Sequence, residues 1–168
     1  MITGTARWYT LGTRLVDAAY TGLTSKPGRK GMVPGEIAWD ACDCGGMLAV
    51  TVPRIFYSEE FPEEAETVVG VRCRAPFEVA EFTVSVVRCA PQPSGAEAAP
   101  AASDLDAAAG LLLQDTAEVM DAVAKALCVM HDGDDIADYL INPAESAGPE
   151  GACVGFTLRV FISLVRGG

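Results

Sequence analysis

Residues 103–130 read SDLDAAAGLLLQDTAEVMDAVAKALCVM and contain the longest regular pattern in the chain. Their apolar positions recur at steps of three and four residues, which places them on one face of an α-helix. This stripe comprises Leu105, Ala109, Leu112, Thr116, Val119, Val123 and Leu127. Ser103 can cap the first turn, and Asp104 and Asp106 follow where the helix dipole favours negative charge. The sequence therefore predicts one long amphipathic helix that needs a surface to pack against.

Two other segments alternate with the period of a β-strand. Residues 77–88 read FEVAEFTVSVVR, with Phe82, Val84 and Val86 on one face and polar side chains on the other. The last strand has a fully apolar face: Val154, Phe156, Leu158, Val160, Ile162 and Leu164. Phe161 makes its second face partly apolar as well, which favours a central strand or one covered in an assembly.

The remaining elements are shorter. Residues 11–23 carry apolar side chains at helical spacing, and Gly22 is a plausible stop. Residues 47–56, MLAVTVPRIF, predict a strand in which Pro53 indicates an edge position or a bend. Residues 136–141 fit either a short helix or a strand. We expect a single α+β domain over residues 1–168, with a mostly antiparallel or mixed sheet against a long helix and a shorter N-terminal helix.

Three segments are expected to be loops. Residues 24–31, TSKPGRKG, combine one proline and two glycines with three cations, and we interpret them as an exposed basic loop. Residues 57–72 include SEEFPEEAE, which has five glutamates in nine residues. Residues 90–102 contain three prolines and no large apolar side chain. The ordinary interpretation of both charged segments is a solvated surface.

The net charge of −11, from 12 basic and 23 acidic residues, excludes most nucleic-acid binders. Such a field repels phosphates, so sequence-specific DNA binding is not expected. In a ring, however, a negatively charged inner surface would let DNA pass through without binding it. The chain contains no apolar run long enough to span a bilayer, and its start lacks the features of a signal peptide. We therefore expect a protein made in the cytoplasm that does not bind membranes.

The six cysteines give no clear metal pattern. They are Cys42, Cys44, Cys73, Cys89, Cys128 and Cys153. Zinc would prefer two cysteine knuckles or a Cys/His set, whereas here one close pair stands alone and the single histidine, His131, is far from it. Reduced structural thiols, disulfides and, as a third alternative, a small cysteine-rich metal or redox module all remain open.

No catalytic constellation is recognisable. A nucleophilic cysteine would need a base, and His131 is the only histidine that could supply one. Neither glycine-rich phosphate-binding motif occurs, and HDGDD at residues 131–135 lacks the spacing of a calcium loop. We predict no cofactor, no metal and no enzymatic activity.

Four separated blocks carry a resemblance. They are GEIAWDACDCGGMLAV at residues 35–50, FTVSVVRCAPQP at 82–93, LDAAAGLLLQDTAEVMDAVAKALC at 105–128 and GPEGACVGFTLRV at 148–160. In that order they resemble the tail terminator or head-to-tail connector proteins of long-tailed phages that infect actinobacteria. The resemblance covers roughly residues 15–165 and is weakest at the termini and in HDGDDIADYLIN.

The resemblance implies a structural role in the virion neck. A tail terminator would form a hexameric ring on the end of the tail tube, stop its polymerisation and join it to the head connector. The implied partners are further copies of the chain, the tail tube protein and a connector or stopper protein, with genomic DNA only passing through the lumen. The alternatives are another connector component (stopper or adaptor) and a monomeric adaptor that binds a host protein.

Two charged groups are candidate contacts in such an assembly. The basic group comprises Lys26, Arg29 and Lys30, and the acidic group comprises Glu59, Glu60, Glu63 and Glu64. Their opposite charges suit a head-to-tail interface between copies. The segment after Pro91 is a third candidate contact.

Overall fold

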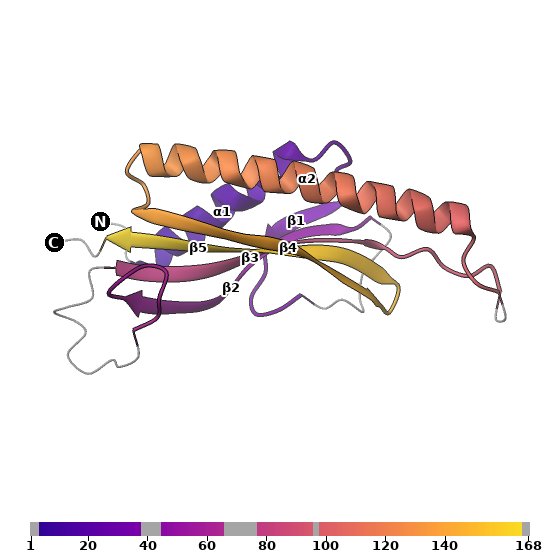
Figure 1. Ribbon diagram of the computed structural model, residues 1–168, viewed down its shortest axis with the longest axis horizontal. Coiled ribbons are helices and arrows are strands. Elements are labelled where there is room, and N and C mark those ends of the chain that lie inside the picture. Colours follow the sequence, from indigo (N-terminus) through magenta and orange to yellow (C-terminus); the bar gives the residue numbers. More distant parts are fainter. Residues whose placement is uncertain (1–3, 38–44, 66–76, 96–97, 166–168) are drawn as a thin grey trace.

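A computed structural model describes residues 4–37, 45–65, 77–95 and 98–165, and shows a five-stranded sheet with two helices on one face (Figure 1). The elements, in chain order, are α1 (Gly4–Gly22), β1 (Arg29–Met32), β2 (Met47–Ser58), β3 (Phe77–Cys89), α2 (Ala102–Asp132), β4 (Asp138–Glu150) and β5 (Cys153–Val165). The expected α+β class is confirmed. Neither described helix is both long and apolar enough to cross a membrane.

The strands are arranged in the order β1-β2-β3-β5-β4, so the sheet is mixed. β1 runs parallel to β2, and the other neighbouring pairs are antiparallel. β5 lies between β3 and β4, so it is a central strand, the first of the two alternatives that its apolar faces favoured. It pairs with β3 from Phe77↔Val165 to Cys89↔Cys153. The two strands with the clearest alternation therefore form the middle of the sheet.

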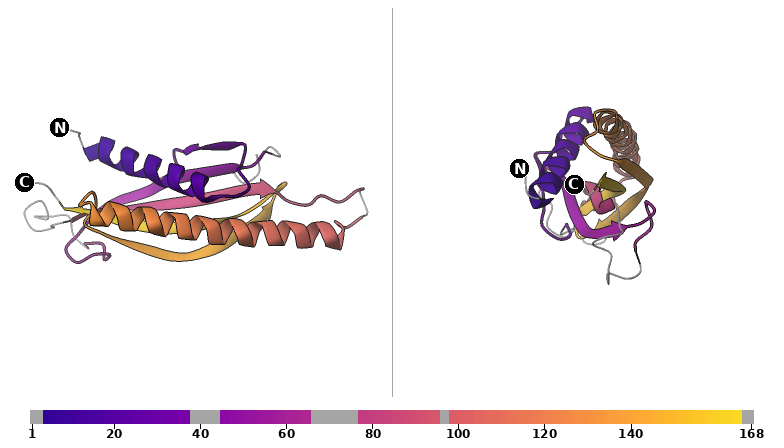
Figure 2. Two further views of the ribbon diagram at one scale, coloured as in Figure 1. Left: turned by 90° about the horizontal axis from the view of Figure 1, so that it is seen from above. Right: turned by 90° about the vertical axis from the view of Figure 1, so that its left-hand side faces the viewer.

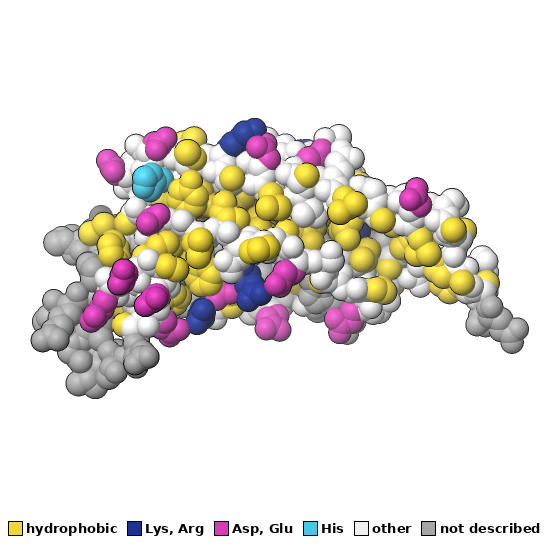
Figure 3. Space-filling model, viewed as in Figure 1, with side chains coloured by type: hydrophobic (Ala, Val, Ile, Leu, Met, Phe, Trp, Pro, Cys, Tyr) yellow, Lys and Arg dark blue, Asp and Glu magenta, His cyan; other side chains and the backbone are white. Residues whose placement is uncertain are grey.

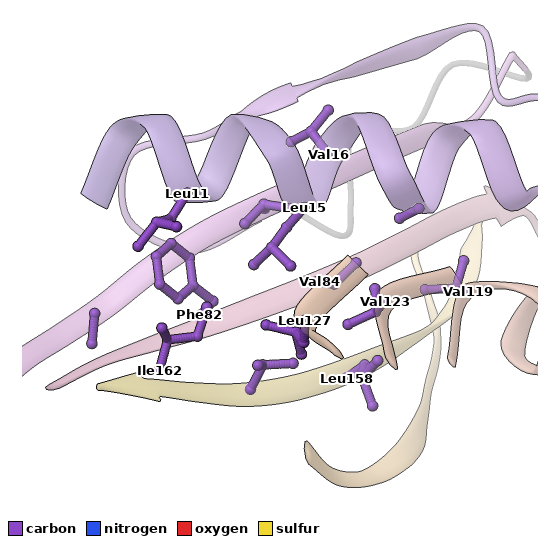
Figure 4. Packing of buried hydrophobic residues seen from close by; sticks show 14 of the residues in the cluster. Leu11, Leu15, Val16, Phe82, Val84, Val119, Val123, Leu127, Leu158 and Ile162 are labelled. Carbon is purple, nitrogen blue, oxygen red and sulfur yellow. The ribbon is translucent and has the colours of Figure 1, made fainter. Parts of the chain in front are cut away.

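The two helices lie side by side over the sheet, and their packing creates the core (Figure 2). At Gly22, a Cβ atom would lie only 2.5 Å from Cβ of Ala122, so a side chain there would push the helices apart. Side chains from both helices point toward the strands, where Leu15, Val123 and Leu127 approach Phe82 and Leu158 (Figure 4). All of these residues belong to one hydrophobic cluster.

Only the C-terminal part of α2 is packed against the sheet. Val119, Val123 and Leu127 are fully buried, whereas Leu105 and Leu113 are 50% and 72% exposed. No residue from 102 to 114 is buried. We call residues 102–114 the α2 overhang. The predicted apolar stripe is thus continuous in sequence, but in its first half Leu112 packs half-buried against the hydrophobic cluster while Leu105 and Ala109 remain exposed.

The start of α2 differs from the prediction. The N-cap position is Ala101, and no side chain caps the helix there. Ser103 lies inside the first turn, so its predicted capping role is wrong. The main chain makes the turn instead, with Asp104 N–H and Leu105 N–H both donating to the Ala101 carbonyl.

The expected basic loop at residues 24–31 is only partly a loop. Arg29–Met32 forms β1, which pairs with the start of β2 from Arg29↔Met47 to Met32↔Val50. Just before it, Gly28 N–H donates to the Gly45 carbonyl at 2.6 Å. The prediction was wrong for these residues because glycine and lysine give little strand signal, whereas a neighbouring strand supplies the hydrogen bonds.

β4 is longer than residues 136–141 suggested. It continues to Glu150 despite Pro143 and Pro149, because it is an edge strand in which missing N–H donors are tolerated. The register shifts between Ile141 and Ala144 and again between Ala147 and Glu150. The prolines therefore interrupt the ladder without ending the strand.

β2 confirms the expectation for Pro53. Its register against β3 shifts between Thr51 and Arg54, and the short β1 leaves the rest of that strand at the sheet edge. Gly46 precedes it with φ +71°, and a Cβ there would lie 2.7 Å from the Val87 carbonyl oxygen. Glycine at position 46 is thus required both by backbone conformation and by space.

We predict that Leu127→Ala destabilises the protein by about 2–5 kcal/mol, since it leaves a cavity between α2 and the sheet. Val129→Ala on the same helix is the control, because Val129 is 66% exposed. It should change the free energy of unfolding by no more than about 0.5 kcal/mol. Urea unfolding of both variants measures the difference, and equal effects would contradict the packing described.

Candidate assembly surfaces

The first predicted contact residue, Lys26, is used inside the molecule. Its Nζ donates to the carbonyl oxygens of Tyr20 at 2.6 Å and Thr21 at 2.8 Å, and also to that of Leu23. Carbonyl groups at the end of a helix lack partners within the helix and attract cations. Lys26 therefore caps the C-terminal end of α1.

Lys30 also contacts α1. Its Nζ lies 2.7 Å from Asp17 Oδ1 and 4.6 Å from the centre of the Tyr20 ring. Arg29 precedes it on β1, and both side chains are exposed. The structure thus places Arg29 and Lys30 on the edge strand of the sheet, beside an aromatic residue of α1.

The acidic group forms a turn after β2. Glu59, Glu60, Glu63 and Glu64 are all exposed. Glu63 N–H donates to the Glu60 carbonyl, and Ala65 N–H donates to the Tyr57 carbonyl, both at 2.9 Å. Arg54 on β2 contacts Glu64 at 2.8 Å and the largely buried Glu81 at 2.6 Å. One glutamate is therefore paired, while the turn as a whole remains strongly acidic.

The basic and acidic groups lie toward opposite ends of the same strand. β1 pairs with the first residues of β2, and the acidic turn follows Ser58 at the other end. Twelve residues in a strand span on the order of 36 Å. The two groups do not meet within one copy, and contact between two copies would require an end-to-end arrangement.

A buried ion pair fixes the segment that connects α1 to β1. Arg88 Nε donates to Asp115 Oδ2 at 2.8 Å, and Arg88 Nη2 donates to the Ser25 carbonyl at 2.6 Å. Burial raises the pKa of Asp115, although the hydrogen bond and charge of Arg88 oppose that rise. This pair was not predicted, but an aspartate four residues before Val119 on the apolar stripe was an available signal.

Glu118, one turn later on α2, holds the neighbouring residue of the same segment. Thr24 donates to Glu118 through its main-chain N–H at 2.7 Å and its hydroxyl at 2.6 Å, and Gln114 donates at 2.9 Å. The hydroxyl of Thr24 and the amide of Gln114, in that order, lower the pKa of Glu118 to about 2. Helix α2 therefore anchors this segment at two successive residues.

The cysteines do not form a metal site in the described part of the chain. No group of three histidine, cysteine, aspartate or glutamate side chains there is arranged to hold an ion. Cys153 is buried and disulfide-bonded, and Cys128 is a free thiol exposed on α2. Cys42, Cys44 and Cys73 lie outside the described residues, as do Trp39 and Asp40.

A hollow of about 440 Å³ lies near the C-terminal end of α2. Its polar side chains are Arg7, His131, Asp134 and Asp135, and the rest of its lining is apolar. The His131 ring stands edge-on to Tyr139, with centroids 6.1 Å apart. None of the residues that line the hollow has a hydroxyl or thiol group that could act as a nucleophile.

No protein-family model matches this chain, and no curated protein matches it in sequence.

We predict a pH-dependent contribution from Glu118. Because its pKa in the folded protein is about 2 rather than 4.5, its contribution to stability is complete above the ordinary value and is lost as the pH falls toward 2. The stability difference between the native protein and Glu118→Gln should therefore shrink between about pH 6 and about pH 3. Thermal unfolding of both proteins over this range measures it, and a difference independent of pH would contradict the assignment.

Proposed function

We propose that this chain is a structural protein of a phage neck, and specifically the tail terminator that caps the tail tube as a ring and joins it to the head connector. In this role it is a virion component, made in the host cytoplasm, and not an enzyme. Its partners are further copies of itself, the tail tube protein and a connector or stopper protein.

The observation that carries this proposal is where the four resembling blocks lie in the fold. They contribute Leu48 and Val50 from β2, Phe82 from β3, Val123 from α2 and Leu158 from β5 to the same hydrophobic cluster. Residues far apart in the sequence thus meet in the interior, where packing constrains them most. A resemblance located there supports a shared fold better than one confined to surface loops would.

The charge distribution supports a passive relation to DNA. The chain carries −11 overall. On the sheet face away from the helices, Arg54 is paired with Glu81 and Glu64, and Arg159 with Glu145. Arginines that are already paired neutralise phosphates poorly, and the excess of acidic groups repels them. DNA would therefore pass such a surface without being held by it.

The decisive experiment is to assemble tails in the absence of this chain. We expect tubes that exceed the normal length, because nothing stops the addition of further tube subunits, and electron microscopy measures their length directly. Tubes of normal length that fail to join heads would instead assign the chain to the stopper or another connector component. Normal particles would contradict any essential role in the neck.

The acidic turn is the proposed contact with the next protein along the tail axis. Glu60→Lys combined with Glu63→Lys should reduce the fraction of tails joined to their partner, because it reverses two exposed charges at one end of the molecule. Glu36→Lys changes a single exposed carboxylate outside the turn and is the control. Counting joined tails by microscopy distinguishes them, and equal joining for all proteins would exclude the turn as a contact.

A further inference from the structure

The molecule has a largely apolar and acidic side and, opposite it, a side that carries basic and aromatic residues. The first, which we call the α2–β4 side, comprises strand β4 and the flank of α2 that carries Leu105, Ala109, Leu113, Ala117 and Met120. The second, which we call the α1–β1 side, comprises Tyr9, Asp17 and Tyr20 of α1 with Arg29 and Lys30 of β1. β1 and β4 are the two outer strands of the sheet, so these sides face in opposite directions.

The α2–β4 side exposes an apolar band. Leu113 is 72% exposed, Leu105 50% and Met120 37%, and steps of three and four residues keep them on one flank of the helix. Figure 3 shows hydrophobic side chains gathered along α2 and over the strand below it. The His131 ring of α2 stands edge-on to the Tyr139 ring of β4, which places this flank of α2 above β4. An exposed apolar band of this extent is typical of an interaction surface.

The charges of the two sides are opposite. β4 carries Asp138, Glu145 and Glu150 and no lysine or arginine, whereas β1 carries Arg29 and Lys30 and no acid. Arg159 on β5 pairs with Glu145, and Asp17 pairs with Lys30, so each side is partly neutralised. Exposed pairs of this kind contribute little and can exchange partners. The formal charge of Asp138, Glu145 and Glu150 together with Arg159 is −2, and that of Arg29 and Lys30 together with Asp17 is +1.

These properties favour a second copy of this chain as the occupant. Two α2–β4 sides would bring the acids of β4 together, which disfavours a two-fold contact. An α2–β4 side against the α1–β1 side of the next copy instead joins acids to bases and places the apolar band against Tyr9, which is 64% exposed. Aromatic residues, methionine and arginine are enriched in such interfaces.

Direct pairing of strands between copies is disfavoured at both edges. β4 contains Pro143 within a register shift, and the open part of β2 contains Pro53 within another. Proline and bulges at a sheet edge interrupt the row of donors that a new strand would need. The contact must therefore be made by side chains and helix flanks.

We propose that the α2–β4 side of one copy binds the α1–β1 side of the next, so that copies associate side by side and head to tail. A heterologous contact of this kind closes into a ring when the rotation allows it. The inference rests on the proposed function, whose ring it would build. It differs from pairing of the basic and acidic groups, which requires copies placed end to end.

The test uses three single variants. Leu113→Asp disables the α2–β4 side and Tyr9→Asp disables the α1–β1 side, because each places a charge inside the contact. Each should weaken self-association by roughly 100-fold or more. Val129→Asp is the matched control, since Val129 is 66% exposed on the same helix but lies in the groove between α1 and α2. It should associate like the native protein.

Sedimentation velocity over a range of concentrations measures the size of the assemblies that each variant forms. The most discriminating sample is a mixture of the two disabled variants. Leu113→Asp keeps an intact α1–β1 side and Tyr9→Asp keeps an intact α2–β4 side, so together they should form a pair that grows no further. A native protein that stays monomeric, a Leu113→Asp variant that assembles normally, or a mixture without pairs would each overturn the proposal. Circular dichroism confirms that the variants are folded.

The tube assay separates this inference from the proposed function. If Leu113→Asp remains monomeric yet limits tube length as the native protein does, the side-to-side contact is wrong and the terminator role stands. If the native protein assembles through these sides but has no effect on tubes or joining, the contact stands and the terminator role is wrong.

Discussion

The ion pair between Arg88 and Asp115 is the constraint on which much of the structure depends. It joins the end of β3 to α2, and the same arginine holds the Ser25 carbonyl in the connection from α1 to β1. Removing one member of a buried pair leaves an uncompensated charge, which costs about 3–5 kcal/mol. Asp115 is also the first buried residue of α2, so the pair marks the point where the helix leaves the sheet.

Sequence periodicity predicted the centre of the fold well. β5 and α2 bury their apolar faces along most or part of their length, and burial of one face is what an apolar period records. β3 buries its apolar face too, and Glu81 and Ser85 on its other face are also buried. β1 and the second half of β4 were missed for the opposite reason. They are edge strands, where glycine and proline are tolerated and where the neighbouring strand, not the local sequence, supplies the hydrogen bonds.

The candidate surfaces were harder to predict, because a side chain's use depends on what the fold brings close to it. Lys26 and Lys30 belong to a basic segment in the sequence, but the end of α1 and Asp17 lie within reach of them in space. The exposed flank of α2 has the same apolar spacing as the buried part. Only the position of the sheet beneath Val119 and Val123 distinguishes the two.

The α2 overhang links this anchoring to assembly. An isolated helix of its length is marginal in water, and none of its residues is fully buried. It persists as a continuation of the packed half, because each added residue extends a helix that is already nucleated. Helical turns held in this way are the least stable part of the helix, and their stability rises most when another surface covers them. A neighbour that covers Leu105 and Leu113 would therefore stabilise the overhang as it binds, which couples the order of one copy to the presence of the next.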